Sequence, residues 1–187
     1  MKKVVLAVLA VMCAASFSFA GTWGLGIKAG AGENKLNKIR NMKTEKGYIL
    51  AGVEILHEFD LSKLNKLGIK VGAETWQKDK ISDSYFWQEF ETYQFPLTLY
   101  YKRDNGVGAF SYYIGGGFTY ITGRSHDSNG HKFSKNKGLV HAMAGTEYRF
   151  TQTFALGLDV AYSHHAGLQS LSNHEGFRGA LVGRFYF

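Results

Sequence analysis

Residues 92–102, TYQFPLTLYYK, alternate between apolar and polar side chains. The odd positions are all aromatic or aliphatic: Tyr93, Phe95, Leu97, Leu99 and Tyr101. The even positions include four polar residues: Thr92, Gln94, Thr98 and Lys102. Because successive side chains of a β-strand point to opposite faces, this period of two predicts a strand with one face in apolar surroundings.

Seven further segments repeat the alternation, and no sustained helical periodicity follows Gly21. The eight segments are 23–30, 49–59, 67–74, 92–102, 111–120, 140–150, 154–163 and 177–187. Each has roughly the 9–11 residues that a tilted strand needs to cross a bilayer. The sequence therefore predicts an all-β fold built from eight membrane-crossing strands.

The connections between these segments alternate in length. Long polar connections are expected over residues 32–46, 79–86, 124–137 and 164–175, and short ones over 60–66, 103–108 and 151–153. Outer-membrane barrels have short turns in the periplasm and long loops outside. The pattern predicts an eight-stranded antiparallel transmembrane β-barrel with both chain ends in the periplasm.

The first residues are typical of a secretory signal peptide, because Lys2 and Lys3 precede an apolar run and the small residues Ser18 and Ala20 follow it. We expect residues 1–20 to be cleaved and residues 21–187 to form the barrel. The single cysteine, Cys13, would leave with the signal, which excludes a disulfide framework and a Cys-based zinc site.

The 187-residue chain has the length of one domain and a formal net charge of +7. Loss of Lys2 and Lys3 leaves 20 basic and 15 acidic residues, a net charge of +5. An exported and modestly basic protein is not expected to bind nucleic acid. The polyanions outside a cell are phosphorylated lipids and glycans.

The parity opposite to the apolar one carries ten charged residues: Lys28, Glu54, Lys70, Glu74, Lys102, Glu147, Arg149, Asp159, Arg178 and Arg184. Eight strands enclose an interior that side chains just fill, and buried charges are accommodated when they are paired. We therefore predict a filled barrel interior that holds an ion-pair network, with a charged ion path as the alternative.

The apolar parity places aromatic residues close to the short turns: Phe59, Tyr101, Phe110, Tyr112, Phe150, Phe154, Phe185 and Phe187. Aromatic girdles of membrane barrels lie at the membrane interfaces, so this face is expected to contact lipid. Pro96 has no N–H to donate, so it should mark a bulge or a gap in the ladder.

Together the signal peptide, residues 95–101 (FPLTLYY), 113–118 (YIGGGF) and the ending 183–187 (GRFYF) resemble the small outer-membrane barrels of the OmpA/OmpX type. The resemblance implies a bacterial outer-membrane location and contact with outer-membrane lipid and lipopolysaccharide. Phe185 and the terminal Phe187 are similar to the signal that the barrel-assembly machinery reads. Members of this superfamily include adhesins, structural proteins, small pores and a few enzymes.

Several histidines and one serine must be considered as residues of a metal site or of a catalytic site. His126, His131, His164, His165 and His174 are expected in long connections, and three converging imidazoles would bind zinc or copper. No HxH or HxxxH pair occurs at fixed strand geometry, so we expect solvated histidines, no metal and no cofactor.

The segment 162–168, YSHHAGL, can be compared with the His-x-Ser-Asn-Ala-Gly segment of lipid A deacylases, which are also eight-stranded barrels. Aligned on Ala166 and Gly167, the positions of the catalytic His and Ser hold Tyr162 and His164. Pairing of Ser163 with His165 would reverse their order. The sequence therefore predicts no catalytic residues.

The first long connection is basic, with Lys35, Lys38, Arg40, Lys43 and Lys46 against Glu33 and Glu45. Residues 124–137 also carry a net charge of +3. Such charges contact either anionic lipid headgroups or an anionic surface glycan. We expect a non-enzymatic structural or adhesin-like protein, with a small-solute pore and a lipid A-modifying acyl hydrolase as alternatives.

Overall fold

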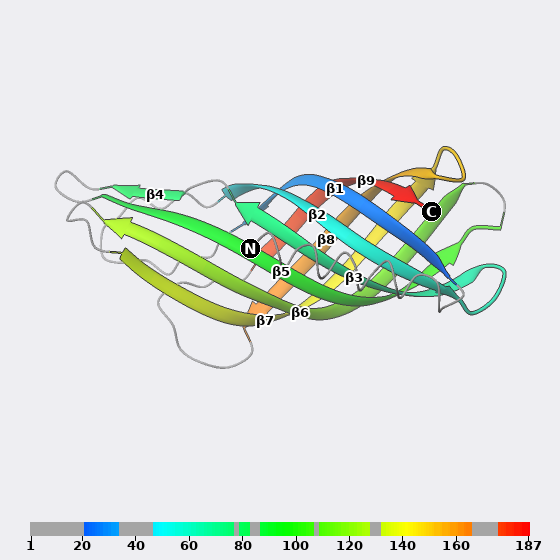
Figure 1. Ribbon diagram of the computed structural model, residues 1–187, viewed down its shortest axis with the longest axis horizontal. Coiled ribbons are helices and arrows are strands. Elements are labelled where there is room, and N and C mark those ends of the chain that lie inside the picture. Colours follow the sequence, from blue (N-terminus) through cyan, green and yellow to red (C-terminus); the bar gives the residue numbers. More distant parts are fainter. Residues whose placement is uncertain are drawn as a thin grey trace.

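The computed structural model describes residues 21–33, 47–76, 79–82, 87–106, 109–127, 132–165 and 176–187. The predicted signal peptide, residues 1–20, and most of the first long connection lie outside this range. The described residues form nine strands (Figure 1): β1 (Thr22–Glu33), β2 (Gly47–Asp60), β3 (Asn65–Trp76), β4 (Asp79–Ser82), β5 (Trp87–Asp104), β6 (Phe110–Asp127), β7 (Lys132–Arg149), β8 (Phe154–His165) and β9 (Gly176–Tyr186).

Eight of these strands close into an antiparallel barrel. The sheet order is β3-β2-β1-β9-β8-β7-β6-β5-β4, and an additional pairing of β3 with β5 closes the circle. β4 is a short strand that pairs only with β5. The predicted eight-stranded all-β barrel is confirmed, and closure leaves the backbone of its membrane-crossing part with no open edge. None of the described residues belongs to a helix that is long and apolar enough to cross a membrane.

The two faces of the sheet follow the alternation of the sequence. On β5, Leu97 is 47% exposed and Leu99 is 56% exposed, whereas Thr98 between them is 2% exposed. The apolar parity therefore covers the outside and the polar parity fills the inside. A soluble protein would bury such an outer surface, so its solvent is hydrocarbon.

Short turns join the strands at one end of the barrel, which we call the short-turn end. Residues 61–64 connect β2 to β3, and Thr151 in the β7–β8 turn accepts a hydrogen bond from the Phe154 amide at 2.9 Å. Gly106 follows β5 with a φ of 51°, a left-handed conformation that favours glycine. Both β1 and the carboxyl terminus reach this end, where the Phe187 amide donates to the Trp23 carbonyl at 2.9 Å.

The opposite end, which we call the long-strand end, differs from the prediction. β5, β6 and β7 are each 18 residues long, almost twice the length needed to cross a bilayer. Residues 124–137, expected as a loop, are largely strand: Arg124 pairs with Ser134, and His126 pairs with Lys132. Residues 79–86 also contain a strand, β4, so both predicted connections are too long.

The physical reason is that ladder hydrogen bonds do not need an apolar face. Where β6 and β7 leave the membrane, polar residues replace the alternating apolar ones, but the backbone groups continue to pair. Figure 1 shows β4, β5, β6 and β7 continuing past the other strands at the left.

Pro96 lies at a gap in one ladder. The pairs between β3 and β5 run to Val71 and Leu97, skip two positions, and resume at Glu74 and Gln94 in the same register. The predicted interruption is therefore a gap rather than a bulge. Gly72 lies opposite, where a Cβ would be 3.1 Å from the proline Cγ, so a side chain there would crowd the ring.

Inward-facing glycines make room for tyrosines of neighbouring strands. The ring of Tyr113 covers its cross-strand partner Gly145, and the ring of Tyr100 covers its partner Gly68. A Cβ at either glycine would overlap the tyrosine ring. The small residues on the polar parity thus complement large ones and allow the interior to be filled.

Candidate functional site

The barrel interior is organised around Arg184 of β9. Its guanidinium contacts three carboxylates from three other strands: Nε lies 2.7 Å from Glu54 Oε1, Nη1 3.1 Å from Glu147 Oε2 and Nη2 3.0 Å from Asp159 Oδ1. All four side chains are buried. One planar cation with five donors therefore ties β2, β7, β8 and β9 together across the lumen.

A second group of ion pairs lies on the long-strand side of Arg184. Lys28 contacts Glu74 at 2.7 Å and Glu54 at 3.2 Å, and Lys70 contacts Asp159 at 2.7 Å. Arg178 adds an ion pair with Glu74 at 2.9 Å and donates to Gln94 at 2.8 Å. Each buried lysine and carboxylate here has an opposite charge within reach, which makes its burial tolerable.

A third group lies on the short-turn side. Lys102 Nζ lies 2.8 Å from Glu147 and 3.0 Å from Glu58, and Lys66 lies 3.6 Å from Glu58. Arg149, half-buried at the rim, is 3.6 Å from Glu147. Its guanidinium stacks over the Tyr186 ring at 4.4 Å. The three groups share carboxylates and form one continuous network from one end of the lumen to the other.

All ten residues expected on the inward face lie in this network, but the sequence reasoning missed several members. Glu58 and Lys66 belong to it, and so do three tyrosine hydroxyls that hydrogen bond to its carboxylates: Tyr100 to Glu58 at 3.0 Å, Tyr186 to Glu147 at 2.6 Å, and Tyr113 to Asp159. Each lies on the polar parity of its strand, so listing every residue of that parity within the predicted segments would have found Glu58 and the tyrosines, and one more residue at the start of β3 would have found Lys66.

A small cavity lies between Arg184 and the long-strand end. Its polar lining includes Lys28, Lys70, Glu74, Arg178 and His141. His141 is held on both sides, because Nε2 lies 2.9 Å from Thr98 Oγ1 and Nδ1 lies 2.9 Å from Thr119 Oγ1. Both ring nitrogens of this inward-facing imidazole are therefore occupied by hydroxyl groups.

The structure separates the residues considered for chemistry. Ser163 faces inward and is 5% exposed, whereas His164 faces outward. His126, His164 and His165 belong to strands rather than to the predicted loops, and His131 and His174 lie outside the described residues. In the part of the chain described, no three His, Cys, Asp or Glu side chains converge on a possible metal site.

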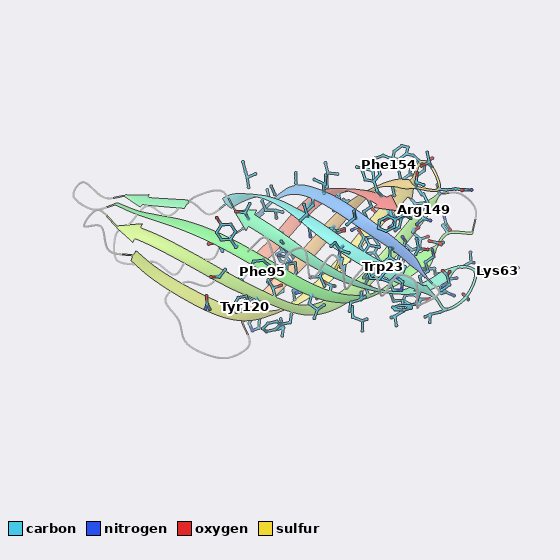
Figure 2. All side chains as sticks on the ribbon, in the orientation of Figure 1. Trp23, Lys63, Phe95, Tyr120, Arg149 and Phe154 are labelled. Carbon is cyan, nitrogen blue, oxygen red and sulfur yellow. The ribbon has the colours of Figure 1, made fainter. Side chains whose placement is uncertain are left out.

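Aromatic side chains lie at two heights on the outer surface, in two groups that we call the aromatic rings; the group on the long-strand side comes from β5, β6, β8 and β9. The one at the short-turn end contains the expected girdle residues and also Trp23 and Tyr148, with Phe154 5.1 Å from Phe185. Phe185 and Phe187 are 54% and 71% exposed on the outside. The second ring contains Phe95 and Tyr120, 6.4 Å apart, on the outer surface in Figure 2.

The rings keep a constant separation along the strands. Four pairs of aromatic residues lie eight positions apart: Tyr93 and Tyr101, Tyr112 and Tyr120, Phe154 and Tyr162, and Phe177 and Phe185. At about 3.3 Å per residue this is about 26 Å along a strand. With a tilt of about 40° the apolar band is about 20 Å tall, close to the band of outer-membrane barrels.

Comparisons with known proteins give one family and several structures. A family model described as an outer membrane protein beta-barrel domain matches residues 4–183. A search of curated proteins finds no match.

Among solved structures, the attachment invasion locus protein Ail of Yersinia pestis is similar, with a TM-score of 0.61, 12% identity, and coverage of 90% of this chain and 100% of Ail. Neisserial surface protein A is similar with a TM-score of 0.59 and 13% identity, and the match covers 88% of this chain and 95% of that protein. A major outer membrane protein from Thermus thermophilus has a TM-score of 0.55 and 14% identity, and the match covers 88% of this chain and 99% of that protein. Ail has also been solved with the heparin analogue sucrose octasulfate.

Proposed function

The chain belongs to the outer-membrane protein β-barrel family, and on this premise we propose that it is a non-enzymatic envelope protein that acts at the cell surface through its long-strand end. In such barrels the short turns face the periplasm and the longer connections face outward. We therefore assign the short-turn end to the periplasm and the long-strand end to the exterior.

The observation that carries this proposal is the length of β5, β6 and β7. They continue beyond the group of aromatic residues that contains Phe95 and Tyr120, and they extend the sheet past the ends of the other strands. The lumen, in contrast, is occupied by paired charges around Arg184. The strands that carry the long-strand end are thus extended, whereas the lumen is filled with paired side chains.

We propose that the partner is an anionic glycan, recognised by basic residues of the exterior. The connection over residues 32–46, outside the described residues except for its first two positions, carries Lys35, Lys38, Arg40, Lys43 and Lys46. The β6–β7 hairpin adds Arg124 and Lys132 at neighbouring positions of its register. In the backbone register Glu91 of β5 lies opposite Arg124, so an acidic position adjoins the basic ones. The complex of Ail with a heparin analogue supports this choice of chemistry.

The test is binding of fluorescent heparin to cells that express the protein. Alanine at all five basic positions from Lys35 to Lys46 should lower binding at least tenfold, and binding by the wild type should fall steeply with salt because exposed charges are screened. A variant with each lysine changed to arginine and Arg40 changed to lysine keeps the charge and should retain binding. Equal binding by the alanine variant, at equal surface expression, would exclude this role of the loop.

Two further partners belong to the same proposal. The outer surface between the aromatic rings would contact outer-membrane lipid and lipopolysaccharide, since its apolar side chains need hydrocarbon. Phe185 and Phe187, exposed on the outside near the carboxyl terminus, would be read by the barrel-assembly machinery. Phe187→Ala should slow assembly in cells, measured by the fraction that migrates as folded protein, without altering refolding of purified protein in detergent.

A further inference from the structure

Two exposed cations at the short-turn end stand apart from the other basic residues. Lys28, Lys66, Lys70, Lys102, Arg149, Arg178 and Arg184 each have a carboxylate within ion-pair distance. Among the Lys and Arg side chains that the structure describes, Lys63 and Arg103 are exposed and have no such partner. Figure 2 shows Lys63 at the outer tip of the β2–β3 turn.

Both cations belong to one patch. The Asp104 amide donates to the Leu64 carbonyl at 2.8 Å, so the turn carrying Lys63 is joined to the end of β5 that carries Arg103. On the outer face, Arg103 lies in register between Asn65 and Tyr112. The Tyr101 hydroxyl donates to Asn65 Oδ1 at 2.6 Å, which holds this side of the patch together.

The neighbouring acids already have partners. Asp60 lies 3.5 Å from Lys66, and Asp104 accepts a hydrogen bond from the Ser111 hydroxyl at 2.7 Å. A hydrogen bond from a neutral hydroxyl leaves the charge of Asp104 in place, so Lys63 and Arg103 together give the patch an excess of one positive charge, carried by exposed side chains.

Apolar side chains lie beside these charges. Leu61 and Leu64 of the turn are 60% and 38% exposed, and Tyr101 and Tyr112, which belong to the group of aromatic residues at the short-turn end, are 40% and 45% exposed. Exposed leucines at a turn are unfavourable in water but fit the boundary between headgroups and acyl chains. Cations and apolar groups thus meet at the height where phosphates meet hydrocarbon.

We propose that Lys63 and Arg103, with the apolar rim around them, form a binding site for an anionic phospholipid of the periplasmic leaflet. The two cations contact the phosphodiester of the headgroup, while Leu61, Leu64 and the tyrosines contact its acyl chains. The site lies at the opposite end from the proposed glycan surface, so it can fail or succeed independently of that function.

The experiment is native mass spectrometry of the protein released from vesicles of phosphatidylethanolamine with a minor fraction of phosphatidylglycerol. The wild type should retain phosphatidylglycerol above its share in the vesicle. The variant K63A/R103A should lose this enrichment, with phosphatidylglycerol affinity lowered roughly 30-fold, since each of the two cations near an anionic surface contributes on the order of 1 kcal/mol. The swapped variant K63R/R103K keeps both charges and should retain the enrichment.

Heat-modifiable gel migration of each variant shows that the barrel is folded, so loss of lipid is distinguishable from loss of structure. Equal enrichment in the wild type and a folded K63A/R103A would overturn the site. Retention of glycerol phosphate in place of the lipid, from detergent solution at equal concentration, would also overturn it, because the proposal requires acyl-chain contacts. Lower enrichment in high salt is expected for exposed charges.

Discussion

At the scale of single residues, Arg184 decides how the lumen is filled. It neutralises Glu54, Glu147 and Asp159 at once, and these carboxylates come from three different strands. Removing one member of a buried ion-pair network is costlier than never having the network, because the remaining charges stay buried without their partner. The contribution of Arg184 to stability is therefore mainly the cost of leaving three carboxylates buried without a cation.

Arg184→Met should lower the free energy of unfolding by about 3–5 kcal/mol, because three buried carboxylates lose their shared cation. Urea titration in detergent micelles, followed by tryptophan fluorescence, measures the change. Arg149→Met is the matched control, since this half-buried guanidinium at the rim contacts a single network carboxylate. Equal losses in the two variants would contradict the central role of Arg184.

Gly145→Ala should destabilise the barrel by about 1–3 kcal/mol, because overpacking displaces a well-packed neighbour. The displaced group is the Tyr113 ring, which covers Gly145 and whose hydroxyl is bonded within the network. Gly179→Ala is the control: it faces outward, and the nearest atom to an added Cβ is 4.0 Å away. The same urea titration should show almost no change for Gly179→Ala.

At the scale of elements, the β6–β7 hairpin shows that a strand can extend beyond the residues that alternate between apolar and polar. In the membrane the alternation of side chains is required, because one face meets lipid and the other meets the lumen. Beyond the aromatic rings only backbone pairing is required, so residues 124–127 and 132–137, which are polar except for Phe133, continue the ladder. Where a strand ends therefore depends on whether its neighbouring strand continues to pair with it, and not on its own sequence pattern alone.

The double variant R124C/S134C should form a disulfide on air oxidation, because these residues are directly opposite and their Cα atoms lie within disulfide range. With Cys13 removed in the expected mature chain, no other thiol competes. Thiol titration before and after unfolding measures the bond. R124C/K132C, shifted by two residues, should oxidise far less; similar oxidation of both would indicate a loop instead of a paired hairpin.

At the scale of the whole molecule, the barrel combines a filled lumen with an apolar band about 20 Å tall. The ion-pair network reaches from Lys66 near the short-turn end to Arg178 near the cavity. An open aqueous path would require several of these buried pairs to separate together. The filled lumen supports the proposed role at the long-strand end over the pore alternative.

The purified protein in planar bilayers should therefore give no large, stable unitary currents. A general porin in the same bilayers is the positive control, and heat-modifiable migration shows that the inserted protein is folded. Large and stable currents from the folded wild type would refute the filled lumen and favour the pore alternative.

The sequence alone determined which face of each strand every side chain takes, because alternation along a strand needs no knowledge of its neighbours. For this reason the period of two is enough to place Lys28, Glu54 and Arg184 inside the barrel and Phe185 outside it. Eight strands and short turns followed from the same pattern.

Which charges meet, and where the strands end, depends on how the strands are paired in the fold. Arg184 reaches Glu54, 130 positions away in the chain, because β1 pairs with both β9 and β2, and its Gly26 lies opposite both residues without a side chain between them. The extension of β6 and β7 through residues expected as loop has the same origin. Both are relations between strands, set by register and closure, whereas the sequence pattern describes one strand at a time.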